Sequence, residues 1–432
     1  MQKFLRGLRQ LSPVFMKMES AVKRALDPTV EEVVSVKKAR LEDTTEVEQK
    51  KRLPKKRKFA MLLCYSGANY YGMQIQNNAE GERWNTVENE LFRAMRECQL
   101  ISEEQRVTPK LFYFQRSSRT DKGVSAVRQM CSLFLSVADN EIQRLPLILN
   151  PLLPQDIRVL GFKRATKGFD SQKAAFARTY TYLAPSFAFA HIDEETTESF
   201  RLPAERLSEI NQLLSAFLGT HNFYNFTSGK LPNDPSCNRY ITECVCDPPI
   251  ERAQLEFVPI RLRGQSFLLH QIRKIVGLCI AIVRGLADKE MLKERVFQAP
   301  RVDIPRAPGL GLMLERVHYD RYDEKFGKTH PLLNEWPEQE PDIEQFKSDK
   351  ILSVIDETER NEKSMLNWLN TLPLHNWDSD SDRMPPLRAA HLTVKGDLPN
   401  LLDKEESKSN DSYQDLEEGE REKKRLNVEQ AA

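Results

Sequence analysis

RTDKGVSA, residues 119–126, places a single carboxylate, Asp121, between the cations Arg119 and Lys122, and Gly123 supplies a turn. Opposite charges close to a carboxylate favour its ionised form. An ionised carboxylate among cations can act as a nucleophile beside a phosphodiester backbone. The alternative interpretation is a solvated turn with an ordinary surface aspartate, and this stretch alone does not decide between the two.

The sequence around this stretch predicts helices and strands that alternate at uneven intervals. Thr86 is the predicted N-cap of the first helix, with Glu88 and Glu90 near its positive end, and Gly219 ends the second helix. No G-x-G-x-x-G motif opens a helix, so an α+β architecture is favoured over a doubly wound nucleotide-binding fold. The predicted strands are 59–65, 130–137, 178–182 and 255–267, the predicted helices are 86–98, 207–218 and 272–283, and an apolar segment closes the region at 305–319.

The chain of 432 residues is long enough for two domains and tails, and its 40% hydrophobic content supports a core. The net charge is only +1, with basic clusters near the N-terminus and acids at the C-terminus. No apolar run approaches the roughly eighteen residues of a membrane span. The predicted parts are a basic arm at 1–58, domains at 59–165 and 166–330, an extension at 331–395 with a docking helix at 364–377, and a disordered charged tail at 396–432.

The N-terminal arm carries two kinds of targeting signal. The first eighteen residues are basic and amphipathic, with no acid before Glu19, as in a mitochondrial transit peptide; a disordered terminus is the alternative. Basic clusters at 37–40 and 50–58 are typical of nuclear import or nucleic-acid contact. We therefore expect one gene product in both nucleus and mitochondrion, with starts at Met16 or Met18 removing the transit-like segment.

Motifs of cofactor and metal chemistry are absent from the sequence. It contains no Walker loop, H-E-x-x-H, G-x-S-x-G or spaced Cys/His cluster. The seven cysteines are scattered, which favours a reducing compartment, and Cys244 and Cys246 lack the partner pair of a zinc site. No clustered carboxylates favour a metal nuclease or RNA hydrolase. The sequence predicts no metal and no cofactor, and leaves chemistry by carboxylate, arginine and tyrosine.

Six motifs in order resemble those of the TruA-type tRNA pseudouridine synthases, most closely the eukaryotic multisite enzymes of nuclei and mitochondria. Lys122 and Ser125 stand where bacterial members usually have Ala and His, and Met73 replaces their Trp. These departures weaken bacterial tRNA positions as a guide to substrate, but they do not affect Asp121. The motifs are YSGANYYGMQIQ (65–76), RTDKGVSA (119–126), RTYTY (178–182), GTHNF (219–223), FLLHQIRKIVG (267–277) and APGLGL (307–312).

The resemblance implies a role for each of four residues. Asp121 is the essential carboxylate, which attacks the sugar or base as a nucleophile or abstracts a sugar proton. Arg273 is its ionic partner, Arg119 fills the place of the flipped base, and Tyr180 stacks on the target base. Tyr182 lies on the same strand face as Tyr180 and is the alternative for that role. His270 is expected to be structural and not a general base.

The resemblance also implies the fold and the reaction. Two α+β halves surround a basic cleft, and their mainly antiparallel sheets join into one with Asp121 at the middle. The expected reaction isomerises uridine in tRNA to pseudouridine, with small nuclear and messenger RNA as further candidate substrates. A noncatalytic RNA-binding or RNA-folding protein on the same scaffold is the alternative. The expected oligomeric state is a monomer or a homodimer. No membrane partner and no small-molecule cofactor are expected.

Overall fold

The computed structural model describes residues 54–77, 81, 83–138, 140–298 and 301–375. The transit-like start, the basic cluster at 37–40, residues 50–53 of the second cluster and everything after residue 375 lie outside the described residues. Within the described part of the chain, no helix is long and apolar enough to cross a membrane.

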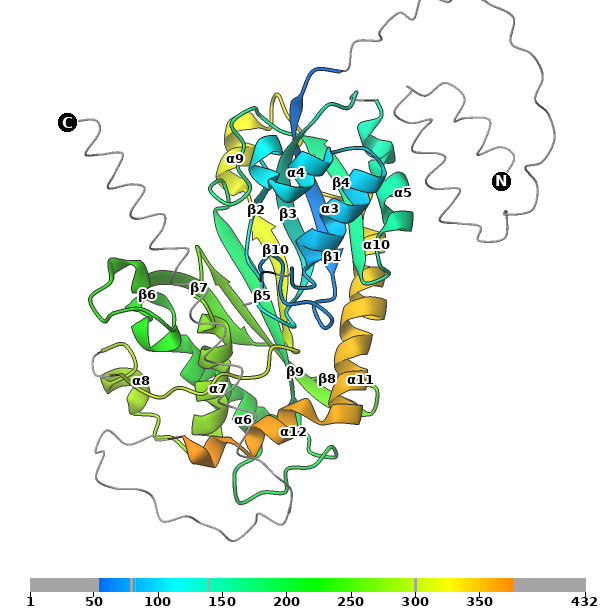
Figure 1. The fold of residues 1–432 in the computed structure, drawn as a ribbon. Coiled ribbons are helices and arrows are strands. Elements are labelled where there is room, and N and C mark those ends of the chain that lie inside the picture. Colours follow the sequence, from blue (N-terminus) through cyan, green and yellow to red (C-terminus); the bar gives the residue numbers. More distant parts are fainter. Residues whose placement is uncertain (1–53, 78–80, 82, 139, 299–300, 376–432) are drawn as a thin grey trace, which may run out of the picture.

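One sheet of ten strands forms the centre of the described region (Figure 1). Its main path runs β4-β1-β3-β10-β5-β9-β7-β6, while β2 pairs with β3 and β8 with β9. Neighbours pair antiparallel except β10 with β3, which confirms the predicted mainly antiparallel α+β class. The strands are β1 Arg57–Tyr65, β2 Gln115–Arg116, β3 Ser125–Leu135, β4 Ile157–Arg164, β5 Ala177–Pro185, β6 Gly219–Asn222, β7 Asn238–Cys246, β8 Ile250–Arg252, β9 Leu255–Gly264 and β10 Leu312–His318.

The two halves of the sheet meet where β10 lies between β3 and β5. On one side, Met313 and Leu314 of β10 pair in parallel with Ser125 and Ala126 of β3. On the other side, β10 pairs antiparallel with β5. A strand from the end of the compact region therefore closes the sheet beside the start of β3. The 119–124 loop, which carries Asp121, leads directly into this junction.

Helices pack against both halves of the sheet. In Figure 1, α3 and α4 lie over the strands of the first half, and α6 and α7 belong to the second. They bury apolar side chains in one contiguous core with the strands. The helices are α3 Val87–Glu97, α4 Glu103–Val107, α5 Leu145–Leu149, α6 Ala204–Ser215, α7 Gln271–Val283, α8 Met291–Glu294, α9 Asp320–Phe326, α10 Glu340–Phe346, α11 Ser353–Glu362 and α12 Ser364–Leu369.

Several predicted boundaries differ from the structure. Thr86 caps α3 as predicted, since its hydroxyl accepts from the backbone N–H of Asn89. Glu88 and Glu90 lie in the first turn of α3, also as predicted, and Glu88 is buried and paired with Arg116. β3 begins at 125, not 130, because its first residues pair with strands far away in sequence. α6 ends at 215, and Gly219, with φ of +91°, begins β6 instead of ending the helix.

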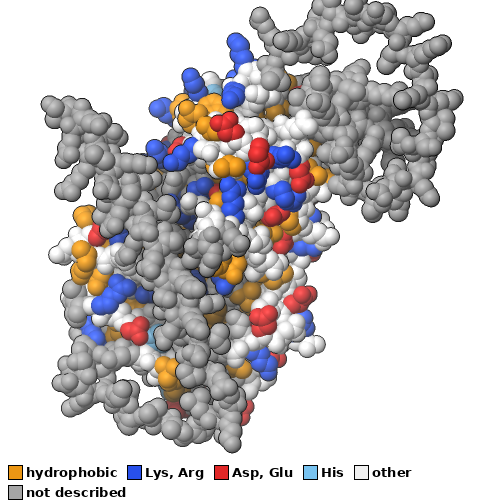
Figure 2. All heavy atoms as spheres, in the orientation of Figure 1, with side chains coloured by type: hydrophobic (Ala, Val, Ile, Leu, Met, Phe, Trp, Pro, Cys, Tyr) orange, Lys and Arg blue, Asp and Glu red, His pale blue; other side chains and the backbone are white. Residues whose placement is uncertain are grey.

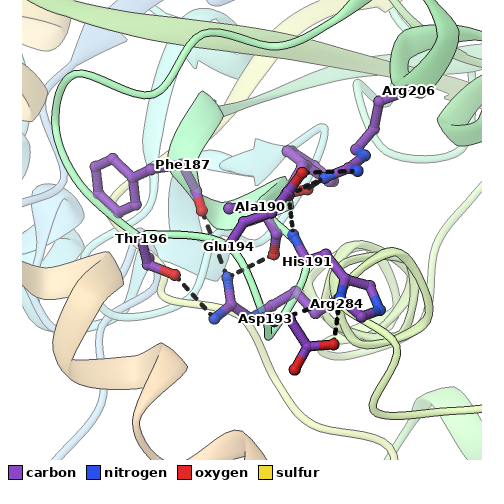
Figure 3. A network of polar contacts seen from close by, with 9 residues as sticks. Phe187, Ala190, His191, Asp193, Glu194, Thr196, Arg206 and Arg284 are labelled. Carbon is purple, nitrogen blue, oxygen red and sulfur yellow. Dashed lines mark hydrogen bonds and ion pairs between the residues drawn. The ribbon is translucent and has the colours of Figure 1, made fainter.

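Helix α7 is fixed at its middle and at its C-terminal end, which matters because its first turn carries Arg273. At the middle, Gly277 lies so close to the 305–307 segment that an added Cβ would sit 2.3 Å from the carbonyl oxygen of Pro305. At the C-terminal end, the buried Arg284 donates to the carbonyl of Ala190 (3.0 Å) and the hydroxyl of Thr196 (3.2 Å) (Figure 3). The position of α7 relative to the sheet is therefore determined by close packing and by buried polar contacts.

The extension after residue 330 is more helical than its polar sequence predicts. Helix α10 continues through a π-helical segment, Lys347–Leu352, into α11. The docking helix expected at 364–377 is present as the shorter α12, and Met365 and Leu369 are its buried residues. In Figure 1 this extension runs from beside β4 past β8, along both halves of the sheet.

Candidate active site

The loop that carries Asp121 is a tight turn. The N–H of Val124 donates to the carbonyl of Asp121 (3.1 Å), and Gly123 has φ of +78°, a conformation that glycine adopts without a Cβ penalty. The hydroxyl of Thr120 bonds that of Tyr65 at 2.7 Å in the core below. The carboxylate therefore projects from a backbone that its own sequence and the adjacent β1 hold in place.

The motif at 65–76 forms the support for this turn. An added Cβ on Gly67 would lie 2.2 Å from the carbonyl oxygen of Val124, and one on Gly72 would lie 2.5 Å from that of Thr120. The N–H of Gly67 donates to the Ser125 hydroxyl at 3.0 Å, and that of Met73 to the Thr120 carbonyl at 3.2 Å. Ser125 and Met73, two of the departures from the bacterial motif, are thus buried parts of the support.

The cations that act on Asp121 differ from those that flank it in sequence. Burial raises the pKa of the Asp121 carboxyl, while the charges of Arg273 and Arg306 oppose that rise. Arg119 and Lys122 are exposed, and Lys122 Nζ lies 4.8 Å from the centre of the Tyr71 ring. This corrects the first interpretation of the motif, in which its own cations keep the carboxylate charged. The Asp121 side chain remains 23% exposed, so solvent or substrate can reach it.

Arg273 meets Asp121 from the first turn of α7, as the resemblance implies. Its Nε donates to the carbonyl of Ala307 at 2.6 Å. Burial and the nearby Arg306 lower the pKa of Arg273 to about 10, and Asp121 opposes the shift. The guanidinium therefore stays protonated at neutral pH. Sequence reasoning missed Arg306, and the one available signal was its position immediately before the APGLGL motif.

His270 lies at the same place but does not pair ionically with Asp121. Its Nε2 is 3.9 Å from the Asp121 carboxylate and 3.1 Å from a terminal nitrogen of Arg306. Burial and the charges of Arg306, Arg273 and Lys274 lower the pKa of His270 to about 3. The ring is neutral at physiological pH and accepts from the guanidinium, which can only donate. This arrangement fits the expected structural role.

The two strand tyrosines occupy different positions. The hydroxyl of Tyr180 bonds Ser118 Oγ at 2.6 Å, and its ring meets Phe267 edge-on at 5.4 Å. Burial raises the pKa of Tyr180, and the charge of Asp121 adds to the rise. Tyr182 is fully buried, and its hydroxyl donates to the carbonyl of Pro308 at 2.9 Å. Tyr180 is therefore the better placed of the two to meet a substrate at Asp121.

Comparison with known proteins gives the family. The family model described as tRNA pseudouridine synthase matches residues 213–320. Pseudouridylate synthase 1 homolog of Mus musculus is 46% identical over 333 residues, which cover 76% of this chain and 77% of the relative. This chain belongs to the tRNA pseudouridine synthase family. It is an isomerase that acts on tRNA.

Other relatives of this tRNA pseudouridine synthase agree. The human Pseudouridylate synthase 1 homolog is 46% identical over 322 residues, 74% of each chain. The tRNA pseudouridine(27/28) synthase of Saccharomyces cerevisiae is 31% identical over 327 residues, which are 61% of this chain and 85% of the relative. The span matched by the family model includes Arg273 and Arg306 but not Asp121 or Tyr180. In the structure, the charge of Asp121 acts on both Tyr180 and Arg273, which links the residues inside and outside the matched span.

In this pseudouridine synthase the site is identified by converging side chains. Two hollows, of about 560 Å³ beside α3 and α4 and about 400 Å³ beside α11 and α12, are lined by none of Asp121, Arg273, Arg306, His270 and Tyr180. Among the described residues, no group of three or more His, Cys, Asp or Glu is placed to hold a metal ion. A partly exposed carboxylate suits a large substrate such as a folded RNA, because the base must be brought to the enzyme.

Positive charge is not spread evenly over the synthase surface. In Figure 2 the Lys and Arg side chains over α3 and α4 lie among Asp and Glu. Arg93 pairs with Glu90 and Glu97, and Arg106 pairs with Glu103. Such paired, solvated charges attract RNA weakly. The basic cleft stays a prediction.

Proposed function

We propose that this synthase isomerises uridine through Asp121, acting as nucleophile or as base toward a sugar proton. The observation that supports the proposal is the convergence of groups from both halves of the sheet on this carboxylate. Arg273 and Arg306 act on its charge, and Tyr180 lies close enough for the charge of Asp121 to affect its pKa. The two guanidiniums favour the ionised form of the carboxylate against the effect of burial, in a partly desolvated setting where a charged group reacts more readily.

The described residues provide the chemical groups that the reaction needs. The C1′–N1 bond of uridine breaks, the base turns, and a C5–C1′ bond forms. The proton that leaves C5 is matched by one gained at N1, so neither an oxidant nor net water is consumed. Asp121 assists the first step by attack or by proton abstraction. Tyr180 stacks on the base and restricts its turning, and its raised pKa keeps the hydroxyl protonated in its hydrogen bond with Ser118.

Arg119 assists access to the base in this proposal. An enzyme that acts on a paired base must extrude it, which costs a few kcal/mol. The Arg119 side chain is exposed on the loop that carries Asp121. A guanidinium plane can stack in the vacated place and also bond to phosphate, so it offsets part of that cost.

The substrate and the compartments are also proposed. The name of the S. cerevisiae relative specifies positions 27 and 28, so uridines at these tRNA positions are the first to test. Small nuclear and messenger RNA are further candidates. The basic, acid-poor first eighteen residues support entry into the mitochondrion, and the basic clusters at 37–40 and 50–58 support entry into the nucleus. Identical distributions of the full chain and a chain starting at Met18 would contradict dual targeting.

Tritium release from C5-labelled uridine in tRNA tests the chemistry. Asp121→Asn and Asp121→Ala should release no tritium while binding tRNA with nearly the wild-type Kd. Substantial turnover by either variant would refute the role of Asp121. Binding without release by the wild-type chain would instead support a noncatalytic RNA-binding protein.

A further inference from the structure

Two aromatic rings and a lysine form a surface group beside the catalytic loop. Lys122 Nζ lies 4.8 Å from the centre of the Tyr71 ring, which contacts Trp84 edge-on. Lys122 is exposed, and both aromatic side chains are partly exposed. The mechanism above uses none of the three. We call Tyr71, Trp84 and Lys122 the platform.

The platform is held in place by backbone contacts. The N–H of Tyr71 donates to the carbonyl of Asn85 at 2.8 Å, and Gln76 Nε2 donates to the carbonyl of Tyr71 at 2.6 Å. The N–H of Trp84 donates to the carbonyl of Gln76 at 3.0 Å. The backbone at Tyr71 and the backbone at Trp84 are therefore each held by hydrogen bonds. A surface ordered in advance binds a ligand with a smaller entropy loss.

The backbone of Lys122 is fixed to the other half of the sheet. An added Cβ on Gly309 would lie 3.1 Å from the Lys122 carbonyl oxygen. Gly72, which follows Tyr71, approaches the catalytic loop so closely that an added Cβ would lie 2.5 Å from the Thr120 carbonyl oxygen and 3.4 Å from the Asp121 carbonyl carbon. Lys122 itself follows Asp121 directly in the chain. The platform therefore adjoins the loop that carries Asp121.

We propose that the platform binds the RNA nucleotide next to the flipped uridine, an inference that rests on the proposed function. Extruding one base unstacks its neighbour, and an exposed base face binds well on an aromatic ring. The Lys122 ammonium is a mobile cation that suits phosphate. When RNA binds, Lys122 moves from the Tyr71 ring to the flanking phosphate, and the ring face becomes free for the base. The alternative is that the rings only close the loop.

A fluorescent base separates these two roles. The tRNA carries 2-aminopurine on one side of a mapped target uridine, and its fluorescence is followed as Asp121→Asn enzyme is added, so that no turnover occurs. Stacking on Tyr71 should quench the signal. Adding Tyr71→Leu should remove the quenching and raise the Kd for tRNA by roughly 10- to 100-fold, the range for losing one stacked base. Tyr71→Phe, which keeps the ring, should bind and quench as the parent does.

Lys122, whose side chain is exposed, gives a second test with a different readout, the salt dependence of binding. Lys122→Met should reduce the slope of log K against log salt by about 0.7 to 0.9, the value for one phosphate contact. Lys122→Arg should keep the slope. An unchanged slope in Lys122→Met would overturn the phosphate contact.

Photocrosslinking of the wild-type chain needs no variant. A 4-thiouridine on either side of the target should crosslink to Tyr71 or Trp84. Crosslinks confined to other residues, or quenching that survives in a folded Tyr71→Leu chain, would overturn the inference. These readouts do not require turnover. Failure of the platform thus leaves tritium release intact, whereas failure of the proposed function abolishes release and leaves the crosslinks informative.

Discussion

The two halves of the sheet hold their functional groups in different ways. In the first half, Asp121 is placed by backbone contacts, with Gly67 and Gly72 packed against the carbonyls of its loop. In the second half, Arg273 and Tyr180 are long side chains on a helix and a strand, and each is fixed by a hydrogen bond. The comparison shows that the first half of the sheet fixes the position of the Asp121 carboxylate, whereas the second half supplies the groups that act on its charge. Changes in the first half should therefore displace the carboxylate, and changes in the second should alter its electrostatics.

Arg273→Met should have the largest effect. It removes a buried cation facing Asp121 and leaves the loop that positions the carboxylate unchanged. Loss of one preorganised electrostatic partner typically costs about 10²- to 10³-fold in rate. We expect a fall of that size in kcat, measured as single-turnover tritium release. Arg273→Lys keeps a charge and should recover part of the loss, and equal activity in Arg273→Met and wild type would break the comparison.

Gly67→Ala tests whether backbone packing in the first half of the sheet fixes the position of Asp121. The new Cβ would meet the Val124 backbone at 2.2 Å, so the loop must shift. Overpacking of this kind costs about 1–3 kcal/mol in the free energy of unfolding. Denaturant unfolding should show this loss, and tritium release should fall as Asp121 moves. Gly168→Ala is the matched control, since its Cβ meets nothing within 4 Å, and it should leave both stability and rate nearly unchanged.

Much of this difference between the two halves of the sheet could be predicted from the sequence. Asp121, Tyr180 and Arg273 belong to motifs whose order along the chain marks the family, and the structure brings all three to one place. The period of apolar residues located α3, which buries one stripe, and α7, which is buried on all sides from Ile275 to Val283. Motifs and helical periods both depend on residues close together in the chain, so they can be recognised from the sequence.

Other features depend on contacts that no local pattern encodes. Arg306 acts on Asp121 because Gly277 lets the 305–307 segment approach α7 closely, which is a tertiary contact. In the extension, the buried residues Ile343, Phe346, Ile351 and Ile355 break helical spacing with one step of five. The π-helical segment absorbs that step. A search for a regular period of 3.6 therefore does not detect the helix.

Arg306→Met should also change the electrostatics of Asp121, with a smaller loss of rate than Arg273→Met. Asp121 is faced by Arg273, Arg306, His270 and Tyr180, and removing Arg306 removes a charge that opposes the rise of its pKa. The pKa should rise further, so the acid limb of the profile of kcat/KM against pH should move to higher pH. We expect a loss of about 10-fold at neutral pH, less than for Arg273. Arg306→Lys should restore the limb, and an unmoved limb in Arg306→Met would contradict the assignment.

Arg252→Met tests whether the extension stabilises the second half without entering the chemistry. Arg252 on β8 pairs with Asp356 of α11 at 3.0 Å, and the Asp356 side chain is only 9% exposed. Leaving a largely buried carboxylate unpaired should cost about 1–3 kcal/mol in the free energy of unfolding. Arg201→Met is the control, because its pair with Glu251 is exposed and should contribute under about 1 kcal/mol. A drop in kcat of Arg252→Met at full folding would mean that the extension also acts on the site.

Asp121→Asn should have the smallest effect on stability, and its sign is informative. A carboxyl whose pKa is higher in the folded chain binds its proton more tightly there, so stability falls as pH rises through the window between the unfolded and folded pKa values. Burial raises the pKa of Asp121 despite Arg273 and Arg306. At neutral pH the ionised group therefore costs stability that the neutral amide does not.

Melting temperatures measured across pH should show this cost as a difference between Asp121→Asn and wild type that disappears at low pH. Asp121→Asn should melt slightly higher than wild type at pH 7, and the difference should disappear below about pH 3.9, the ordinary aspartate pKa, where both side chains are neutral. Ser118→Ala, which changes no charge, should show a constant difference over the same range. An Asp121→Asn variant that melts lower at pH 7 would mean that the two guanidiniums outweigh burial. The carboxylate would then be a structural ion pair and not a group held charged at a cost to the fold.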